Sequence, residues 1–305
     1  MTTFVFPGQG SQYIGMAKDF NDNFKNAKLT FEEIEDYTNI NIRNIIFNNE
    51  DNKLDLTQYT QICIFASSYV IFTTYIIEND LKIENIDVML GHSLGEYTAL
   101  ACCKKLNLKE SSLILKKRGE LMNTAITPNE TGMAALIGKD CDYIQNLINK
   151  NKLNLQIAND NSPMQIVISG NINEINHSKD FFLDNDIKKF VILNVSAAFH
   201  SKYMDKAQKK LSSEIENLNF IDNNIKIISN YDANIYKDNS TIKKNLQFQM
   251  SNKVNWTKSI KKLEEIGEVN IIEIGPNKVL SGLIKRISKN FEIVSINEVS
   301  DINKT

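Results

Sequence analysis

The sequence is poor in proline, carries no surplus of charge and shows no long apolar run. Only 4 of its 305 residues are proline. No stretch approaches the run of about 18 apolar residues that a membrane span needs, which predicts a protein without a membrane-spanning helix. The 35 basic and 37 acidic residues give a formal net charge of -2, so the charge balance favours binding to neither nucleic acid nor an anionic membrane. We therefore expect a water-soluble protein whose partners include neither.

Cysteine and arginine are also scarce. None of the four cysteines lies in a CxxC pattern, so we expect free thiols in a reducing compartment and no metal site. The amino terminus has no basic segment followed by an apolar signal core, which adds to the expectation of a cytoplasmic protein. Arginine occurs only at Arg43, Arg118 and Arg286, while lysine supplies nearly all the positive charge. Each guanidinium is therefore a candidate for a functional role.

The length exceeds what one hydrophobic core usually fills, so a domain with an insertion, or two domains, is expected. Between 133 and 195 the patterns alternate as strand, helix, strand, strand, helix, strand, which favours an inserted ferredoxin-like subdomain. Outside this segment, apolar strands alternate with longer helices, which predicts an α/β-hydrolase-like large domain with a mainly parallel sheet. We divide the chain into a catalytic domain over 1–125 and 200–305 and a subdomain over 126–199, with a boundary signal at 127–130.

Apolar periodicity gives the expected elements of both parts. Helices are predicted over 59–77, from about 96 onward, and over 108–122, 143–149, 172–183, 202–218 and 254–266. Strands are predicted over 4–6, 87–90, 133–137, 153–158, 165–169, 189–195, 225–228, 270–274 and 293–296.

The segment from Gly91 to Gly95 reads Gly-His-Ser-Leu-Gly, the GxSxG pattern of a nucleophile elbow. Such a short pattern also occurs by chance, but here a predicted strand precedes it and a predicted helix follows. The turn would lift the Ser93 hydroxyl away from the sheet. The backbone N–H of Leu94 and the helix dipole would then favour negative charge on an attacked carbonyl oxygen.

A serine hydroxyl is a weak nucleophile until a base takes its proton, and the chain has only three histidines. We expect the side chain of His92, inside the elbow, to point away and support the turn. His177 falls in a polar helical stretch that is typical of the surface. A lone histidine is usually structural, but elimination and its place at the end of the insertion make His200 the predicted base.

Two further residues are candidates for contacts with a substrate. Glycines flank Gln9 in the loop 7–12, which lacks the Gly-Lys-Ser or Gly-Lys-Thr of a phosphate-binding loop. The Gln9 N–H is therefore suited to be a second oxyanion donor. Arg118 lies in Lys-Lys-Arg-Gly-Glu, which is typical either of a solvated helix face or of a bidentate site for a substrate carboxylate.

Five motifs together resemble the malonyl-CoA:acyl carrier protein transacylases, in the family's order and nearly end to end. They are Phe-Val-Phe-Pro-Gly-Gln-Gly-Ser-Gln from Phe4, Gly-His-Ser-Leu-Gly-Glu-Tyr from Gly91, Arg-Gly at Arg118, Ala-Phe-His-Ser around His200, and Glu-Ile-Gly-Pro-Asn-Lys-Val-Leu from Glu273. The resemblance implies that Ser93 is acylated with His200 as base. It also implies that Gln9 and Leu94 donate to the oxyanion and that Arg118 holds the malonyl carboxylate.

The family implies further roles. The backbone carbonyl of Gln249 would orient the imidazole, and Phe199 would be the bulky residue that favours malonyl over methylmalonyl units. Asn159 and Asn161 match a region near the cleft that contacts substrate. Lys253 stands where the family commonly has proline, which leaves the details of that loop open.

The resemblance implies a function in fatty acid synthesis, with malonyl-CoA and acyl carrier protein as partners, no cofactor and a monomeric state. Three alternatives remain at this point. A thioesterase or esterase would use the same elbow with water as the acceptor. A degenerate acyltransferase would only bind the carrier protein. A polyketide assembly line would use the same reaction as fatty acid synthesis.

Overall fold

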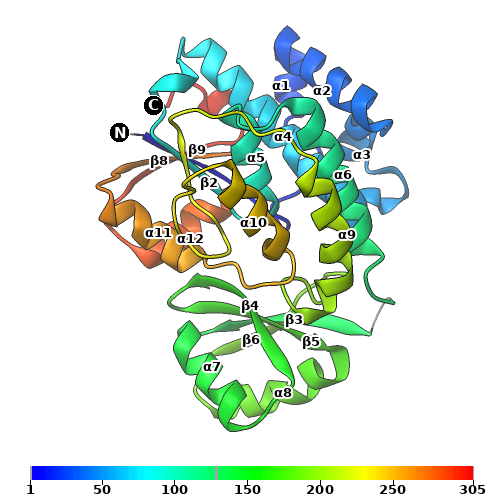
Figure 1. The fold of residues 1–305 in the computed structure, drawn as a ribbon, viewed down its shortest axis with the longest axis vertical. Coiled ribbons are helices and arrows are strands. Elements are labelled where there is room, and N and C mark those ends of the chain that lie inside the picture. The colour runs from blue at the N-terminus through cyan, green and yellow to red at the C-terminus, as the bar shows by residue number, and fades with distance from the viewer. Residues whose placement is uncertain (1, 128–129, 305) are drawn as a thin grey trace.

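The computed structural model describes residues 2–127 and 130–304. Figure 1 shows a larger part, which contains both ends of the described chain, and a smaller part built from the middle of the sequence. The larger part is built on a five-stranded sheet whose neighbouring strands all run parallel. Its strand order is β7 (Lys226–Ile227), β2 (Val88–Gly91), β1 (Thr2–Phe6), β8 (Asn270–Ile274) and β9 (Glu292–Ile296).

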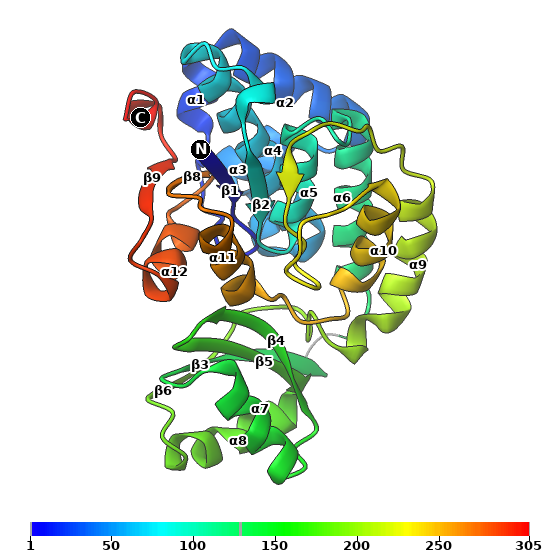
Figure 2. The same ribbon diagram turned by 60° about the vertical axis from the view of Figure 1, so that its left-hand side comes forward.

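Helices cover both faces of this sheet (Figure 2). Successive residues of a strand point to opposite faces, so Phe4 and Phe6 of β1 enter one apolar core while Val5 enters another. The helices that complete the large part are α1 (Lys18–Asn23), α2 (Lys25–Thr38), α3 (Ile42–Asn48), α4 (Thr57–Glu78), α5 (Leu94–Cys102), α6 (Leu108–Asn123), α9 (Asp205–Glu216), α10 (Asn239–Gln249), α11 (Trp256–Glu265) and α12 (Val279–Ile287). Short 3₁₀ turns occur at Glu50–Asp55, Ile83–Asn85, Lys202–Met204 and Val299–Asp301.

Helix α4 corrects one expectation from the sequence. Its 22 residues are long and apolar enough, by length and composition, to cross a membrane, so the prediction that no stretch reaches this limit was wrong. In the fold, 83% of an apolar 18-residue segment of this helix is buried inside the protein. The helix packs against α2, α5 and α6. This burial is typical of a core helix, and we assign α4 to the core.

The smaller part is an antiparallel sheet with two helices. Its elements are β3 (Thr131–Ile137), α7 (Cys141–Lys150), β4 (Leu155–Ser162), β5 (Gln165–Asn171), α8 (Ile172–Asp184) and β6 (Lys189–Ile192). The strand order β4-β5-β3-β6 is that of a ferredoxin-like unit. The predicted fold class, a parallel sheet with a separate inserted sheet, is confirmed. The division at 126–199 stays a prediction, and Pro128 and Asn129 of its boundary signal lie outside the described residues.

The two parts meet along β4. The Asp160 N–H donates to the Val254 carbonyl oxygen at 3.0 Å, and the Val254 N–H donates to that of Ala158 at 2.9 Å. β4 also packs against α11 and α12. This contact brings Asn159 and Asn161 of the small part close to the carboxyl end of β2, where the nucleophile elbow lies.

Candidate active site

Ser93 lies on the tight turn between β2 and α5. Its φ of 54° places a non-glycine residue in the left-handed region, a conformation typical of functional sites. A Cβ at Gly95 would lie 2.1 Å from the Phe6 carbonyl oxygen, and one at Gly91 would lie 2.1 Å from the carbonyl group of Gly95. Both glycines are therefore required because backbone approaches backbone, as the elbow pattern predicts.

Asn230, from the loop after β7, fixes the elbow on both sides. Its Oδ1 accepts a hydrogen bond from the Ser93 N–H at 2.6 Å, and its Nδ2 donates to the Gly91 carbonyl oxygen at 2.7 Å. The residue is fully buried. Sequence reasoning missed Asn230, because one asparagine among many in this chain carries no signal.

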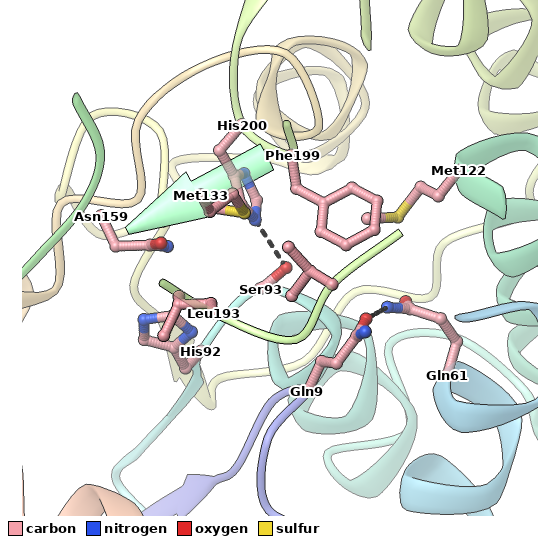
Figure 3. A pocket seen from close by; sticks show the side chains of 11 residues that line it. Gln9, Gln61, His92, Ser93, Met122, Met133, Asn159, Leu193, Phe199 and His200 are labelled. Carbon is pink, nitrogen blue, oxygen red and sulfur yellow. Dashed lines mark hydrogen bonds between the residues drawn. The ribbon is translucent and has the colours of Figure 1, made fainter. Parts of the chain in front are cut away.

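The Ser93 hydroxyl and the His200 imidazole point toward one another across the pocket (Figure 3), with Oγ 2.8 Å from Nε2. The other ring nitrogen, Nδ1, lies 2.9 Å from the Gln249 carbonyl oxygen and 3.1 Å from that of Asn252. Carbonyl oxygens only accept, so Nδ1 carries the hydrogen and Nε2 is free to accept the serine proton. Burial, and then the nearby Arg118 charge, lower the pKa of His200 to about 3, which keeps the imidazole neutral.

Arg118 lies beneath the same hydroxyl and not on a solvated helix face. Its side chain is fully buried, and Nη2 donates to Ser93 Oγ at 2.9 Å and to Gln249 Oε1 at 3.0 Å. Nη1 donates to Gln61 Oε1. Among the described residues no carboxylate forms an ion pair with this guanidinium, and Nε has no hydrogen-bond partner. Burial lowers the pKa of Arg118.

A cavity of about 100 Å³ opens beside Ser93. Its lining consists of Gln9, Gln61, His92, Ser93, Met122, Met133, Asn159, Leu193, Val195, Phe199 and His200. The predicted residues Gln9, Asn159 and Phe199 thus share one pocket with the serine and the histidine (Figure 3). The small volume and the mixed apolar and polar lining suit a short acyl group with a polar end.

His92 differs from its expected position. We expected its side chain to point away from the pocket, but it lines the cavity. Its Nε2 lies 2.8 Å from Asn161 Oδ1, and its ring centroid lies 5.6 Å from that of Trp256. The partner comes from β4, 69 positions away, so the elbow pattern alone gives no sign of it. His177 is exposed, as expected.

The acyl transferase domain family matches residues 3–302 of the chain. The chain belongs to this family. It is 34% identical over 304 residues to the malonyl CoA-acyl carrier protein transacylase of Bacillus subtilis, with 98% of this chain and 94% of the relative covered. It is 35% identical over 294 residues to a polyketide biosynthesis malonyl CoA-acyl carrier protein transacylase of the same organism, with 96% and 99% covered.

The malonyl CoA-acyl carrier protein transacylase from Clostridium perfringens, a solved structure, superposes with a TM-score of 0.92 at 32% identity, covering 99% of this chain and 95% of that one. These relatives carry the name of the family that the five motifs resemble, so the resemblance is confirmed. Within this acyl transferase, the Leu94 side chain is fully buried at the start of α5. The Leu94 N–H follows directly after the Ser93 N–H in the chain, and the Ser93 N–H itself donates to Asn230 Oδ1.

Proposed function

We propose that the chain transfers the malonyl group of malonyl-CoA to the pantetheine thiol of acyl carrier protein through a malonyl-serine intermediate. One observation carries the proposal: in a chain of this family, Ser93 Oγ lies between His200 Nε2 at 2.8 Å and Arg118 Nη2 at 2.9 Å. The arrangement joins a nucleophile, a neutral base and a buried cation, which are the three groups that attack on an acid-bearing thioester requires.

In the first half-reaction, Ser93 Oγ bonds to the thioester carbonyl carbon while its proton passes to His200 Nε2. The Gln9 and Leu94 N–H groups would stabilise the oxyanion. When the intermediate collapses, the carbon–sulfur bond breaks and His200 returns the proton to the departing coenzyme A sulfur. The Gln249 carbonyl, 2.9 Å from Nδ1, would hold the ring in the required tautomer and stabilise the imidazolium.

In the second half-reaction, the pantetheine thiol of the carrier protein gives its proton to His200 and attacks the malonyl-serine carbonyl. The ester bond to Ser93 breaks, and His200 returns the proton to Oγ. The enzyme is restored without net consumption of protons. No metal or redox cofactor is required by this proposal, because a thioester is already activated toward attack.

Arg118 would select the acyl group. An arginine fork binds a carboxylate through two parallel hydrogen bonds, and an acetyl group would leave the buried guanidinium without an anion. Phe199 would limit the space beside the acyl carbon, while Asn159 and Asn161 would contact the substrate from β4. The present partners of the guanidinium are all uncharged, so a substrate carboxylate would be a stronger acceptor than any of them.

We place this reaction in the cytoplasm and in fatty acid synthesis, and we expect a monomer. The Bacillus subtilis relative without a polyketide designation supports fatty acid synthesis, while the similar identity to the polyketide relative makes a polyketide assembly line the competing assignment. The structure of the site is suited to both, because the reaction is the same.

The test is a transfer assay with malonyl-CoA and two forms of the carrier protein, one with and one without its pantetheine arm. We expect malonyl-carrier protein only with the form that bears the thiol, together with matching release of coenzyme A. Equally fast release of coenzyme A without any carrier protein would identify a hydrolase and contradict the proposal. No acylation of Ser93 at all would indicate a binding module.

A further inference from the structure

Glu96, on the first turn of α5, is a buried carboxylate to which the proposed reaction assigns no role. Its side chain is 1% exposed. Oε1 accepts a hydrogen bond from the Tyr236 hydroxyl, and Oε2 accepts from Gln249 Nε2 at 2.6 Å and from the Asn230 N–H at 3.2 Å. Three hydrogen-bond donors thus stabilise a carboxylate whose burial without partners would be highly unfavourable.

Two of these partners hold the reacting groups. Asn230 accepts from the Ser93 N–H, while Gln249 donates to the Ser93 carbonyl oxygen, accepts from Arg118 and offers its own carbonyl to His200. Glu96 touches none of the three reacting side chains. A single residue, Asn230 or Gln249, nevertheless links Glu96 to each of them by hydrogen bonds.

Glu96 also sets which way the Gln249 amide faces. A carboxylate only accepts hydrogen bonds, so the Gln249 amino group must face Glu96. Its amide oxygen is then left to face Arg118, at 3.0 Å from Nη2. With the amide reversed, an amino group would oppose the guanidinium and a carbonyl would oppose the carboxylate. Both contacts would be repulsive.

The charges of this cluster balance before substrate binds. Arg118 is fully buried, and the negative charge of the nearby Glu96 carboxylate partly offsets its positive charge. A malonyl carboxylate on Arg118 adds a second negative charge near the same cation. A buried cluster with one excess anion is unfavourable, and binding one proton removes the excess.

We propose that Glu96 is a positioning residue that aligns Asn230 and Gln249 around the reacting groups, and that it takes up a proton from solvent when a carboxylate-bearing acyl group binds Arg118. This inference rests on the proposed function, because it requires the malonyl group to occupy the Arg118 site. It predicts that malonyl-CoA binding is linked to pH in a way that acetyl-CoA binding is not.

The surroundings of Glu96 set the pH at which this uptake is observed. Burial raises the pKa of Glu96 to about 7, against the opposing effect of the hydrogen bonds from Tyr236, Gln249 and Asn230. The titratable and charged groups that face it are Tyr236 and Asp232 from the loop after β7, Arg118 from α6 and Tyr97 on α5. Near pH 7.5, before substrate binds, the Glu96 carboxyl is mostly ionised, so a substrate anion nearby can drive proton uptake.

The experiment is isothermal titration calorimetry of the Ser93→Ala variant, which binds the thioester without reacting. Titrations in buffers of different ionisation enthalpy give the number of protons taken up with malonyl-CoA and with acetyl-CoA. The acetyl-CoA value subtracts any protons linked to the coenzyme A phosphates. We expect an excess of roughly half a proton for malonyl-CoA near pH 7.5 if the anion raises the pKa of Glu96 by about one unit, and nearly none near pH 5.5.

A second substitution, Glu96→Gln in the same background, should abolish the excess. In the otherwise native enzyme, Glu96→Gln should slow Ser93 acylation roughly ten- to a hundredfold, because one charge-assisted hydrogen bond is lost. If Glu96→Gln does not fold, Tyr236→Phe serves instead. Loss of its hydroxyl raises the pKa of Glu96, so the pH of maximal uptake should move upward.

The outcomes separate this inference from the proposed function. An unchanged excess in Glu96→Gln, an unmoved pH maximum in Tyr236→Phe, or no excess while malonyl-CoA still binds more tightly than acetyl-CoA would each overturn the role of Glu96 alone. If malonyl-CoA binds no better than acetyl-CoA and the native chain never acylates Ser93, the proposed function fails and the inference fails with it.

Discussion

Replacing Arg118 by alanine should change which acyl group the enzyme accepts. The guanidinium is fully buried and its hydrogen-bond partners, Gln61, Ser93 and Gln249, are uncharged. A malonyl carboxylate bound there would form a buried ion pair. Breaking such a pair by removing one partner costs roughly 3–5 kcal/mol.

We take the lower end of that range, because the cavity beside Ser93 opens to solvent. About 3 kcal/mol corresponds to roughly a hundredfold loss in kcat/KM for malonyl-CoA. An acetyl group has no carboxylate, so its transfer loses no ion pair in the variant. The variant also has no buried guanidinium that an acetyl group would leave unpaired. Acetyl transfer should therefore be retained or increased. Loss of the hydrogen bond to Ser93 Oγ would affect both substrates alike, so the informative quantity is the ratio of the two kcat/KM values.

The assay is single-turnover acylation with malonyl-CoA and acetyl-CoA, followed by intact-protein mass spectrometry. Arg286→Ala is the matched control, because Arg286 is exposed and donates to Gln165 at 2.9 Å, far in the sequence from the elbow. We expect the malonyl-to-acetyl ratio to fall about a hundredfold in Arg118→Ala and to stay unchanged in Arg286→Ala. Equal losses for both substrates would refute the assignment of Arg118 to the carboxylate.

Two further predictions concern stability. The pKa of His200 is lowered to about 3 in the fold and is about 6.5 in an unfolded chain, so its contribution to stability is complete above about pH 6.5 and decreases as the pH falls toward 3. At pH 4.5 the loss in the free energy of unfolding is about 2–3 kcal/mol. Urea unfolding should show that His200→Gln lacks this loss, whereas His177→Gln, at an exposed position, retains it. Identical dependence of stability on pH in the two variants would contradict the reasoning. Gly95→Ala should destabilise the fold by more than about 3 kcal/mol, because its Cβ would lie 2.1 Å from a backbone oxygen. At Gly282 no described atom beyond its chain neighbours and the backbone of its own helix lies within 4 Å of an added Cβ. Gly282→Ala should therefore be neutral or stabilising by up to about 1 kcal/mol. Thermal unfolding tests the pair, and similar melting temperatures would show that the elbow has room for a side chain.

Short motifs allowed the main groups of the site to be predicted. Ser93, His200 and Arg118 come from three separate segments, and the structure places both His200 and Arg118 within hydrogen-bond distance of Ser93 Oγ. The reason is physical: the elbow needs glycine where backbone meets backbone, and arginine is rare in a chain rich in lysine. Such constraints leave a clear pattern in a single sequence.

Residues that act through tertiary contacts left no such pattern. Asn230, Gln61 and the carbonyl of Asn252 complete the site, but amide side chains and backbone carbonyls are present everywhere in the chain. The wrong expectation for His92 has the same origin, because its partner Asn161 belongs to the inserted part. Glu96 belongs to the motif that begins at Gly91, yet only the fold shows that it contacts Asn230 and Gln249.

The secondary structure shows a similar division. The strands of both sheets were predicted within a few residues, because most of them contain a short run of apolar residues, including the largely exposed β6. Helices α1, α2, α3, α10 and α12 were not predicted. Asparagine is a weak helix former and is frequent in α1, α3 and α10. The predicted helix over 202–218 is divided into a 3₁₀ turn at Lys202–Met204 and α9, a distinction that apolar periodicity does not contain.

The most direct test of the account is peptide mass spectrometry after brief exposure of the enzyme to malonyl-CoA. A single malonyl adduct should form on the peptide that contains Ser93, and acyl carrier protein bearing its pantetheine thiol should remove it. The His200→Ala variant should form the adduct far more slowly. An adduct on another residue, or one that water removes as fast as the carrier protein does, would contradict the account.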